Sequence, residues 1–172
     1  MVLSDNDCSI LKSFWDSSSV LNQETSKYAN LSGKKVKLKT DGVKANYVNI
    51  EDESKINFIL SKIKPLGIKS ISLQEASIMR YIKGDYFGLH RDFPDYGYDR
   101  LNRTVIIQLS SSDDYVGGDL LVKGTAQPRE LGSVISVMSN EPHEVTEVLQ
   151  GERYSLAVFL LNRDILTKKS LL

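Results

Sequence analysis

Two histidines and one aspartate are the residues whose types and spacing could hold a metal ion. His90 and His143 are the only histidines in the 172-residue sequence, and Asp92 follows His90 at i+2. Side chains at i and i+2 of a β-strand share one face, so His90 and Asp92 can converge on one point. Two histidines and a carboxylate on one face of an ion suit a non-haem iron(II) oxygenase. The pattern alone also fits a surface histidine near a solvated aspartate.

Arg153 is the second residue that suggests chemistry, because it begins an otherwise apolar segment shortly after His143. A buried arginine is costly without a partner. A dicarboxylate cosubstrate that chelates iron through one end needs a cation for its far carboxylate, and a guanidinium offers a planar fork of two donors. Ser155 at i+2 could add a hydroxyl donor on the same strand face. The alternative is an arginine at a strand end whose head group reaches water.

These residues need a scaffold. The spacing of apolar and turn residues along the chain predicts one that is mainly β with supporting helices. Helical spacing of apolar residues predicts helices near residues 5–15 and 52–63, and residues 16–45 favour loops with one short strand. From residue 68 onward, short β-rich runs alternate with turn residues, which is typical of a jelly roll. The runs are Ser70 to Tyr81, Tyr86 to His90, Thr104 to Leu109, Asp119 to Lys123, Ser133 to Met138, Glu144 to Leu149 and Arg153 to Leu161.

The length and hydrophobic content predict a single domain over residues 1–172, because 41% hydrophobic residues can bury a core around a site. We expect residues 1–67 to form a helical and loop support region. Residues 68–163 would form the catalytic core, and residues 164–172 a C-terminal tail. The sequence shows no internal repeat and no second-domain linker.

Charge and cysteine content exclude several classes of partner. Lys plus Arg and Asp plus Glu are equal at 22 each, so the sequence has no excess of basic residues. A nucleic-acid substrate is therefore not favoured, although a local basic patch stays open. The first residues do not form a signal peptide, and no segment approaches the ~20 apolar residues of a membrane span. We therefore expect a soluble, cytoplasmic protein without a membrane partner. Cys8 is the single cysteine, which rules out an internal disulfide and a thiolate metal cluster.

Four motifs in order resemble the prolyl-hydroxylase-type branch of the 2-oxoglutarate and iron(II) dependent dioxygenases. They are Tyr81 to Asp92 (YIKGDYFGLHRD), Arg103 to Ser110 (RTVIIQLS), Tyr115 to Leu120 (YVGGDL) and His143 to Leu156 (HEVTEVLQGERYSL). The resemblance covers roughly residues 70–163. It implies a double-stranded β-helix, cupin-like, with N-terminal helices packed on one sheet.

The resemblance also implies a catalytic ligand set and cofactors. Carried over by position, His90, Asp92 and His143 bind iron(II), and Arg153 pairs with the far carboxylate of 2-oxoglutarate. Dioxygen is the other substrate, and a requirement for ascorbate stays open.

Further positions of the resemblance concern the pocket for the cosubstrate. Ser155 matches the serine of an Arg-x-Ser element, Tyr81 falls where many members place a tyrosine against 2-oxoglutarate, and Gln108 lies on a strand lining that pocket. Tyr81 also fits a core aromatic, and Gln108 an outward strand residue. Gly117-Gly118 most simply forms a turn between strands.

The expected reaction is hydroxylation of an unactivated C–H bond, with decarboxylation of 2-oxoglutarate to succinate and carbon dioxide. By family analogy the acceptor is a prolyl residue of a peptide or protein. A free amino acid or other small molecule is the alternative, and the oligomeric state is open. The segment after Asp92 predicts a substrate-covering loop with Tyr96, Tyr98 and Arg100 as candidate substrate contacts.

Neighbouring branches and other classes are disfavoured by particular residues. Halogenating relatives replace the carboxylate ligand with a small residue, whereas Asp92 is present here. Nucleic-acid-demethylating relatives carry Arg-x-Asn-x-Thr, whereas this chain has Arg153 to Ala157, RYSLA. A non-catalytic jelly-roll binding module, or a degenerate oxygenase with a structural role, would require the three ligands and Arg153 to coincide by chance.

Overall fold

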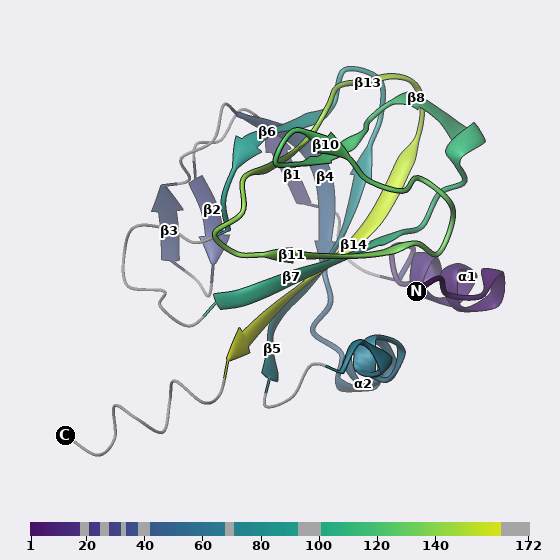
Figure 1. Ribbon diagram of the computed structural model, residues 1–172, viewed down its shortest axis with the longest axis vertical. Helices are drawn as coiled ribbons and strands as arrows, with labels where there is room; N and C mark the ends of the chain where they lie inside the picture. Colours follow the sequence, from purple (N-terminus) through teal and green to yellow (C-terminus); the bar gives the residue numbers. More distant parts are fainter. Residues whose placement is uncertain are drawn as a thin grey trace.

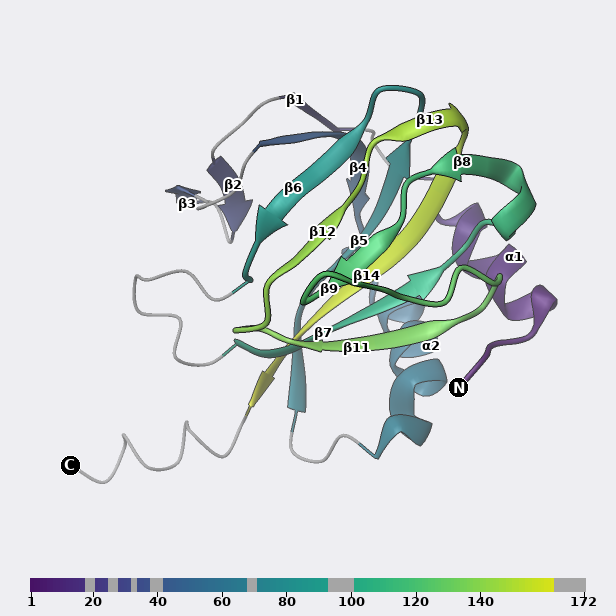
Figure 2. The same cartoon turned by 45° about the horizontal axis from the view of Figure 1, so that its top comes forward.

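The protein is a curled antiparallel β-sheet with two helices on one of its faces (Figure 1). The computed structural model describes residues 1–17, 21–24, 28–31, 34–37, 42–67, 71–92 and 101–162. Figure 2 shows the sheet curling so that β6, β12 and β9 lie over β5, β14 and β7. This is the double-stranded β-helix expected from the sequence, so the predicted fold class is confirmed.

The described residues form two α-helices and two short 3₁₀ helices, and both α-helices begin at a side-chain cap. They are α1 (Asp5–Ser13), α2 (Glu53–Ile63) and the short 3₁₀ helices η1 (Lys64–Leu66) and η2 (Ser112–Asp114). The Ser4 hydroxyl accepts from the backbone N–H of Asp7, and the Asp52 carboxylate accepts from that of Lys55. Gly67, at φ 66°, ends η1 in the left-handed conformation. No helix in the described part of the chain has the length and apolar character of a membrane span.

One large sheet contains most of the strands, in the order β10-β9-β12-β6-β4-β5-β14-β7-β11, with β1 also paired to β4. Two small sheets pair β13 with β8 and β2 with β3. The bounds are β1 Leu21–Glu24, β2 Tyr28–Leu31, β3 Lys34–Lys37, β4 Val43–Asn49, β5 Ile71–Tyr81, β6 Tyr86–His90, β7 Leu101–Gln108, β8 Tyr115–Gly117, β9 Leu120–Val122, β10 Thr125–Ala126, β11 Val134–Met138, β12 His143–Val145, β13 Val148–Gly151 and β14 Arg153–Asn162.

The two faces of the sheet bury two separate hydrophobic cores, because side chains alternate along each strand. The outer face packs against the helices through Cys8, Leu11, Phe14, Val48, Ile50, Ile59, Ile63, Ala76, Ile78, Val105, Ile107, Leu109, Leu156, Val158 and Leu160. The inner face, enclosed by the curl, buries Val43, Ala45, Met79, Tyr81, Ile106, Leu120, Ile135, Val137, Val145 and Val148. Side chains on the inner face therefore point into one shared interior.

Several elements differ from the sequence-based expectations. Residues 16–45, expected to form loops with one short strand, contain β1, β2, β3 and the start of β4, and the short strands β8 and β10 were not predicted. We did not predict β4, although Val43 and Ala45 alternate with polar residues; it joins the large sheet between β5 and β6. The run predicted from Glu144 to Leu149 is two strands, β12 and β13. Thr146 separates them because its backbone and hydroxyl hydrogen-bond the backbone of Asp119, which redirects the chain toward β8.

Candidate metal centre

The curl brings His90, Asp92 and His143 together. His90 ends β6 and His143 begins β12, and the two are register partners in adjacent antiparallel strands. Asp92 follows β6 directly. Their donor atoms all lie within 4.8 Å of one another, and the three side chains are buried or partly buried. The sequence could place His90 beside Asp92, but only strand pairing places His143 opposite them.

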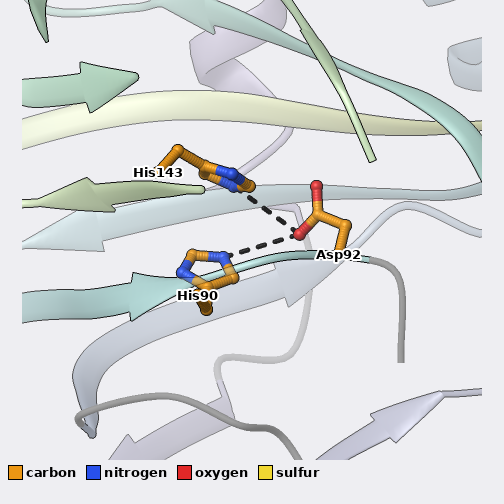
Figure 3. Close-up of side chains that lie close together, drawn as sticks. All are labelled: His90, Asp92 and His143. Atoms are coloured by element: carbon orange, nitrogen blue, oxygen red, sulfur yellow. Dashed lines mark ion pairs between the residues drawn. The ribbon is translucent and has the colours of Figure 1, made fainter. Parts of the chain in front are cut away.

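The geometry of the three side chains leaves their donor atoms facing one another (Figure 3). One carboxylate oxygen of Asp92, Oδ1, lies 3.5 Å from Nε2 of His90 and 3.6 Å from Nε2 of His143. The imidazole centroids are 4.2 Å apart. A metal ion needs converging donors of this type, and two imidazoles with one carboxylate match the set that binds iron(II).

Backbone carbonyls fix which nitrogen of each imidazole is free. Nδ1 of His90 lies 2.9 Å from the Gly88 carbonyl, and Nδ1 of His143 lies 3.0 Å from that of Glu141. A carbonyl oxygen only accepts hydrogen bonds, so each Nδ1 carries the hydrogen. In the neutral imidazole, Nε2 then keeps its lone pair and can coordinate a metal.

The charge states also favour metal binding. Burial lowers the pKa of His143, although the charge of Asp92 opposes this, so His143 is neutral at neutral pH. For Asp92, burial raises the pKa. The side-chain hydrogen bond with His90, the charges that His143 and His90 carry when protonated, and the hydrogen bond from the Thr104 hydroxyl together outweigh this effect. The net pKa is lowered, and the site therefore presents a carboxylate and a lone pair on His143.

Two residues that the sequence did not mark as functional, Thr104 and Phe87, contact predicted metal ligands. Thr104, on the inner face of β7, donates its hydroxyl hydrogen to the second carboxylate oxygen of Asp92. Phe87 stacks on His90, with centroids 4.0 Å apart and planes 10° from parallel. The i+4 spacing of Thr104 and Gln108 could have indicated a shared face. Phe87 reaches His90 because a bulge shifts the pairing of β6 with β12, which no sequence signal marks.

Arg153 is fully buried on the inner face and has neutral partners there. Its guanidinium donates to Oε1 of Gln108 at 3.0 Å and to Oγ of Ser155 at 3.2 Å. Its Nε has no hydrogen-bond partner among the described residues. Because a buried cation is expensive without an anion, this arrangement fits an acidic ligand. Gln108 and Ser155 face inward, so the outward alternative for Gln108 is wrong.

Tyr81 lies beside Arg153, as its register partner in the neighbouring strand. The guanidinium carbon is 5.2 Å from the centroid of the Tyr81 ring. Burial raises the pKa of Tyr81 to about 12, although the charge of Arg153 opposes the rise. The phenol therefore stays protonated at neutral pH and can donate a hydrogen bond.

Gly118 allows the backbone to approach Arg153 closely. It has a φ of +61°, and a Cβ at this position would lie 2.8 Å from Cγ2 of Val148 and 3.3 Å from Cδ of Arg153. The Gly117-Gly118 turn therefore has the structural role that the sequence suggested, and it also limits where the Arg153 side chain can lie. Tyr96, Tyr98 and Arg100 fall outside the described residues, so their contact with a substrate stays a prediction.

Comparison with known proteins identifies a matching family of oxygenases and relatives named as hydroxylases. The model of a family described as the 2OG-Fe(II) oxygenase superfamily matches residues 76–161. A PKHD-type hydroxylase of Parvibaculum lavamentivorans is 35% identical over 80 residues, covering 44% of this chain and 36% of that protein. One from Shewanella baltica is 33% identical over 90 residues, covering 47% and 40%. The chain thus matches well under half the length of these curated relatives.

Solved structures share the fold at low sequence identity. A viral collagen prolyl hydroxylase from Paramecium Bursaria Chlorella virus-1 has a TM-score of 0.68 at 16% identity, covering 93% of this chain and 92% of that one. A Pseudomonas putida prolyl-4-hydroxylase has a TM-score of 0.64 at 17% identity, covering 94% and 89%. With the match across residues 76–161, we conclude that this chain belongs to the 2OG-Fe(II) oxygenase superfamily, whose cofactors are iron(II) and 2-oxoglutarate.

Proposed function

We propose that this protein is a hydroxylase that uses iron(II), 2-oxoglutarate and dioxygen to oxidise an unactivated C–H bond of a prolyl residue. The observation that carries the proposal is the convergence of His90, Asp92 and His143 on the same face that buries Arg153. The metal would activate dioxygen while 2-oxoglutarate is decarboxylated to succinate and carbon dioxide.

In this proposal the three ligands occupy one face of the metal. The Nε2 atoms of His90 and His143 and the Oδ1 atom of Asp92 would bind it, since the other polar atoms of these side chains already have protein partners. Hydrogen bonds that hold each ligand in one orientation reduce the rearrangement needed on binding. With three protein ligands, the site would leave coordination positions for the cosubstrate and dioxygen.

Arg153 would bind the far carboxylate of 2-oxoglutarate, with Ser155, Gln108 and Tyr81 around it. Thr104 contacts Asp92 and Gln108 contacts Arg153, both from the inner face of β7. At the rise of a β-strand, four residues separate their Cα atoms by about 13 Å. This span has room for the side chains and an extended diacid between the metal and the guanidinium. The Nε of Arg153, which has no hydrogen-bond partner among the described residues, and the phenol of Tyr81 are further donors for that carboxylate.

A prolyl residue in a peptide or protein is the acceptor we favour. The structural neighbours include a viral collagen prolyl hydroxylase and a prolyl hydroxylase from Trichoplax adhaerens in complex with a hypoxia inducible factor peptide fragment. Their likeness supports the fold and makes proline the first substrate to test. The cytoplasmic location stays a prediction, and a requirement for ascorbate stays open.

Succinate release from 2-oxoglutarate tests the proposal. The purified chain with iron(II) is screened against prolyl peptides, free amino acids and single-stranded nucleic acids. We expect stimulation by prolyl peptides and a mass gain of one oxygen on proline. Stimulation by free amino acids alone would mean that the acceptor is a free amino acid and not a prolyl residue. If no substrate class gives succinate, the proposed hydroxylase function is contradicted.

A matched pair of variants shows that the signal comes from the proposed centre. Asp92→Ala should abolish succinate release, because it removes the carboxylate ligand. Asp16→Ala, which removes a carboxylate from an exposed position, should leave it unchanged. Equal activity in the two variants would contradict the assignment of the ligands.

A further inference from the structure

A second group of polar side chains lies on the inner face of the sheet, apart from the metal ligands and the residues around Arg153. It consists of Tyr47 and Asn49 on β4 and Glu75 and Ser77 on β5, here called the Glu75 cluster. The Ser77 hydroxyl lies 2.8 Å from Oδ1 of Asn49 and 3.2 Å from Oε1 of Glu75. The hydroxyl has one hydrogen to share between two acceptors, so neither acceptor is fully satisfied by it.

Strand alternation places the cluster on the inner face. Met79 and Tyr81, on the same side of β5, belong to the inner core, whereas Ala76 and Ile78 belong to the outer core. The hydrogen bond between Ser77 and Glu75 confirms that both point the same way as Met79. Glu75 therefore faces the interior that the metal ligands also face.

The sheet register places Glu75 two strands away from Thr104, the residue that contacts the metal ligand Asp92. Glu75 pairs with Phe159 of β14, and Phe159 pairs with Thr104 of β7, which holds Asp92. Adjacent strands lie about 4.8 Å apart, so the Cα atoms of Glu75 and Thr104 are about 10 Å apart across the sheet. A substrate whose reacting carbon lies at the metal can therefore reach Glu75 with a neighbouring group.

Among the residues that the structure describes, no cation pairs with the partly buried carboxylate of Glu75. Burial raises its pKa, and the hydrogen bond from Ser77 offsets this only in part. Within the described ranges, neither lysine nor arginine forms an ion pair with it. Burial of its own phenol raises the pKa of the neighbouring Tyr47, and the negative charge of Glu75 raises that pKa further. A positively charged ligand would supply the missing partner.

We propose that the Glu75 cluster is a substrate subsite that binds a cationic nitrogen, a guanidinium or ammonium group, close to the carbon that is oxidised. Phe159, the register partner of Glu75, offers an aromatic side chain against which a guanidinium can stack while it donates to the carboxylate. The role of the cation in a reaction rests on the proposed hydroxylase function, whereas its binding does not. The substrate is then a basic peptide or an amine-bearing molecule.

Binding can be measured without turnover. The isotope-labelled full chain, loaded with zinc(II) and 2-oxoglutarate, is titrated with arginine amide or with citrulline amide, its isostere. Both are Nα-acetylated, so that the guanidinium is the only charge by which they differ. We expect arginine amide to shift the backbone amide signals of Asn49 and Ser77, with a Kd about tenfold lower than that of citrulline amide. Equal affinities, or shifts elsewhere only, would overturn the subsite, and this comparison needs no variant.

Two variants test whether Glu75 causes the preference for arginine amide. Glu75→Gln keeps the size of the side chain and removes its charge, and it should bring the two Kd values within about twofold of each other. Glu147→Gln removes a carboxylate from an exposed loop position and should keep the tenfold difference. If the preference for arginine amide persists in Glu75→Gln, another group binds the cation and the proposal is wrong.

A second arm separates this inference from the proposed function. Peptides with arginine or citrulline next to a proline are compared in the succinate assay. Stimulation only by the arginine peptides, lost in Glu75→Gln, supports both proposals. Arginine amide binding without succinate release from any peptide keeps the cationic subsite and contradicts the prolyl hydroxylase. Equal stimulation by both peptides contradicts the subsite as a determinant of specificity.

Discussion

Thr104 donates its hydroxyl hydrogen to the carboxylate oxygen of Asp92 that the two histidines do not approach. The two residues lie on opposite sides of the residues 93–100 in the sequence, and the hydrogen bond joins β7 to the end of β6. One oxygen of Asp92 is thereby engaged by the protein and the other faces the histidines. Thr104 is a positioning residue, because it acts on a metal through Asp92.

The first prediction is that Thr104→Val weakens metal binding. The substitution keeps the branched shape and removes the hydroxyl, so Asp92 loses its orienting partner. We expect the Kd for cobalt(II) or iron(II), measured by anaerobic titration, to rise roughly 10- to 100-fold. Thr104→Ser, which keeps the hydroxyl, should restore most of the affinity. Equal loss in both variants would mean that packing, not the hydrogen bond, is what Thr104 contributes.

The second prediction separates stability from ligand binding at Arg153. Arg153→Met removes a fully buried cation whose partners are neutral, so the ligand-free protein should be as stable or up to about 4 kcal/mol more stable in urea. The same variant should lose about 2–5 kcal/mol of 2-oxoglutarate binding. The visible band of the anaerobic iron complex reports this binding. A destabilised variant that still binds 2-oxoglutarate would contradict the assignment.

The third prediction compares two glycines with similar backbone conformations. Gly118 has φ +61° and Gly124 has φ +75°, so alanine at either position should cost about 1–2 kcal/mol of backbone strain. A Cβ at Gly118 also meets Val148 and Arg153, whereas one at Gly124 meets nothing within 4 Å. We expect Gly118→Ala to lose about 1–3 kcal/mol more in urea denaturation. It should also weaken 2-oxoglutarate binding, and Gly124→Ala should not.

The fourth prediction concerns pH and Glu75. Because burial raises its pKa above the ordinary 4.5, the folded protein holds the proton more tightly than the unfolded chain. The contribution of Glu75 to the free energy of unfolding then falls as the pH rises from 4.5 through the raised pKa. Glu75→Gln removes this dependence. The variant should be more stable than the wild type at neutral pH, and the difference should shrink toward about pH 4.

Urea denaturation at several pH values checks this prediction, with Glu147→Gln as the control. Glu147 is exposed, so its variant should follow the wild-type curve. A Glu75→Gln curve parallel to the wild type at all pH values would show that Glu75 titrates normally.

The strand pattern and the chemistry of the centre could be predicted from the sequence because both are local. His90 and Asp92 share a strand face by their spacing, and the alternation from Arg153 onward predicts β14. Short-range geometry fixes these features, so the order of residues is enough to find them.

Contacts between strands could not be predicted, because register is decided by packing of the whole sheet. The pairing of His143 with His90, the bulge that stacks Phe87 on His90 and the inward position of Gln108 all depend on it. β4 also escaped prediction, because its membership of the sheet depends on β5 and β6 on either side.

The sequence by itself determined which residues could bind a metal and an acidic ligand, and the period of the strands that present them. The tertiary structure alone decided that Thr104 orients Asp92 and that Glu75 lies across Phe159 from the same centre. The reason is that a slip of one residue in strand pairing moves every side chain to the opposite face. Only the folded sheet, with both of its cores buried, selects one register.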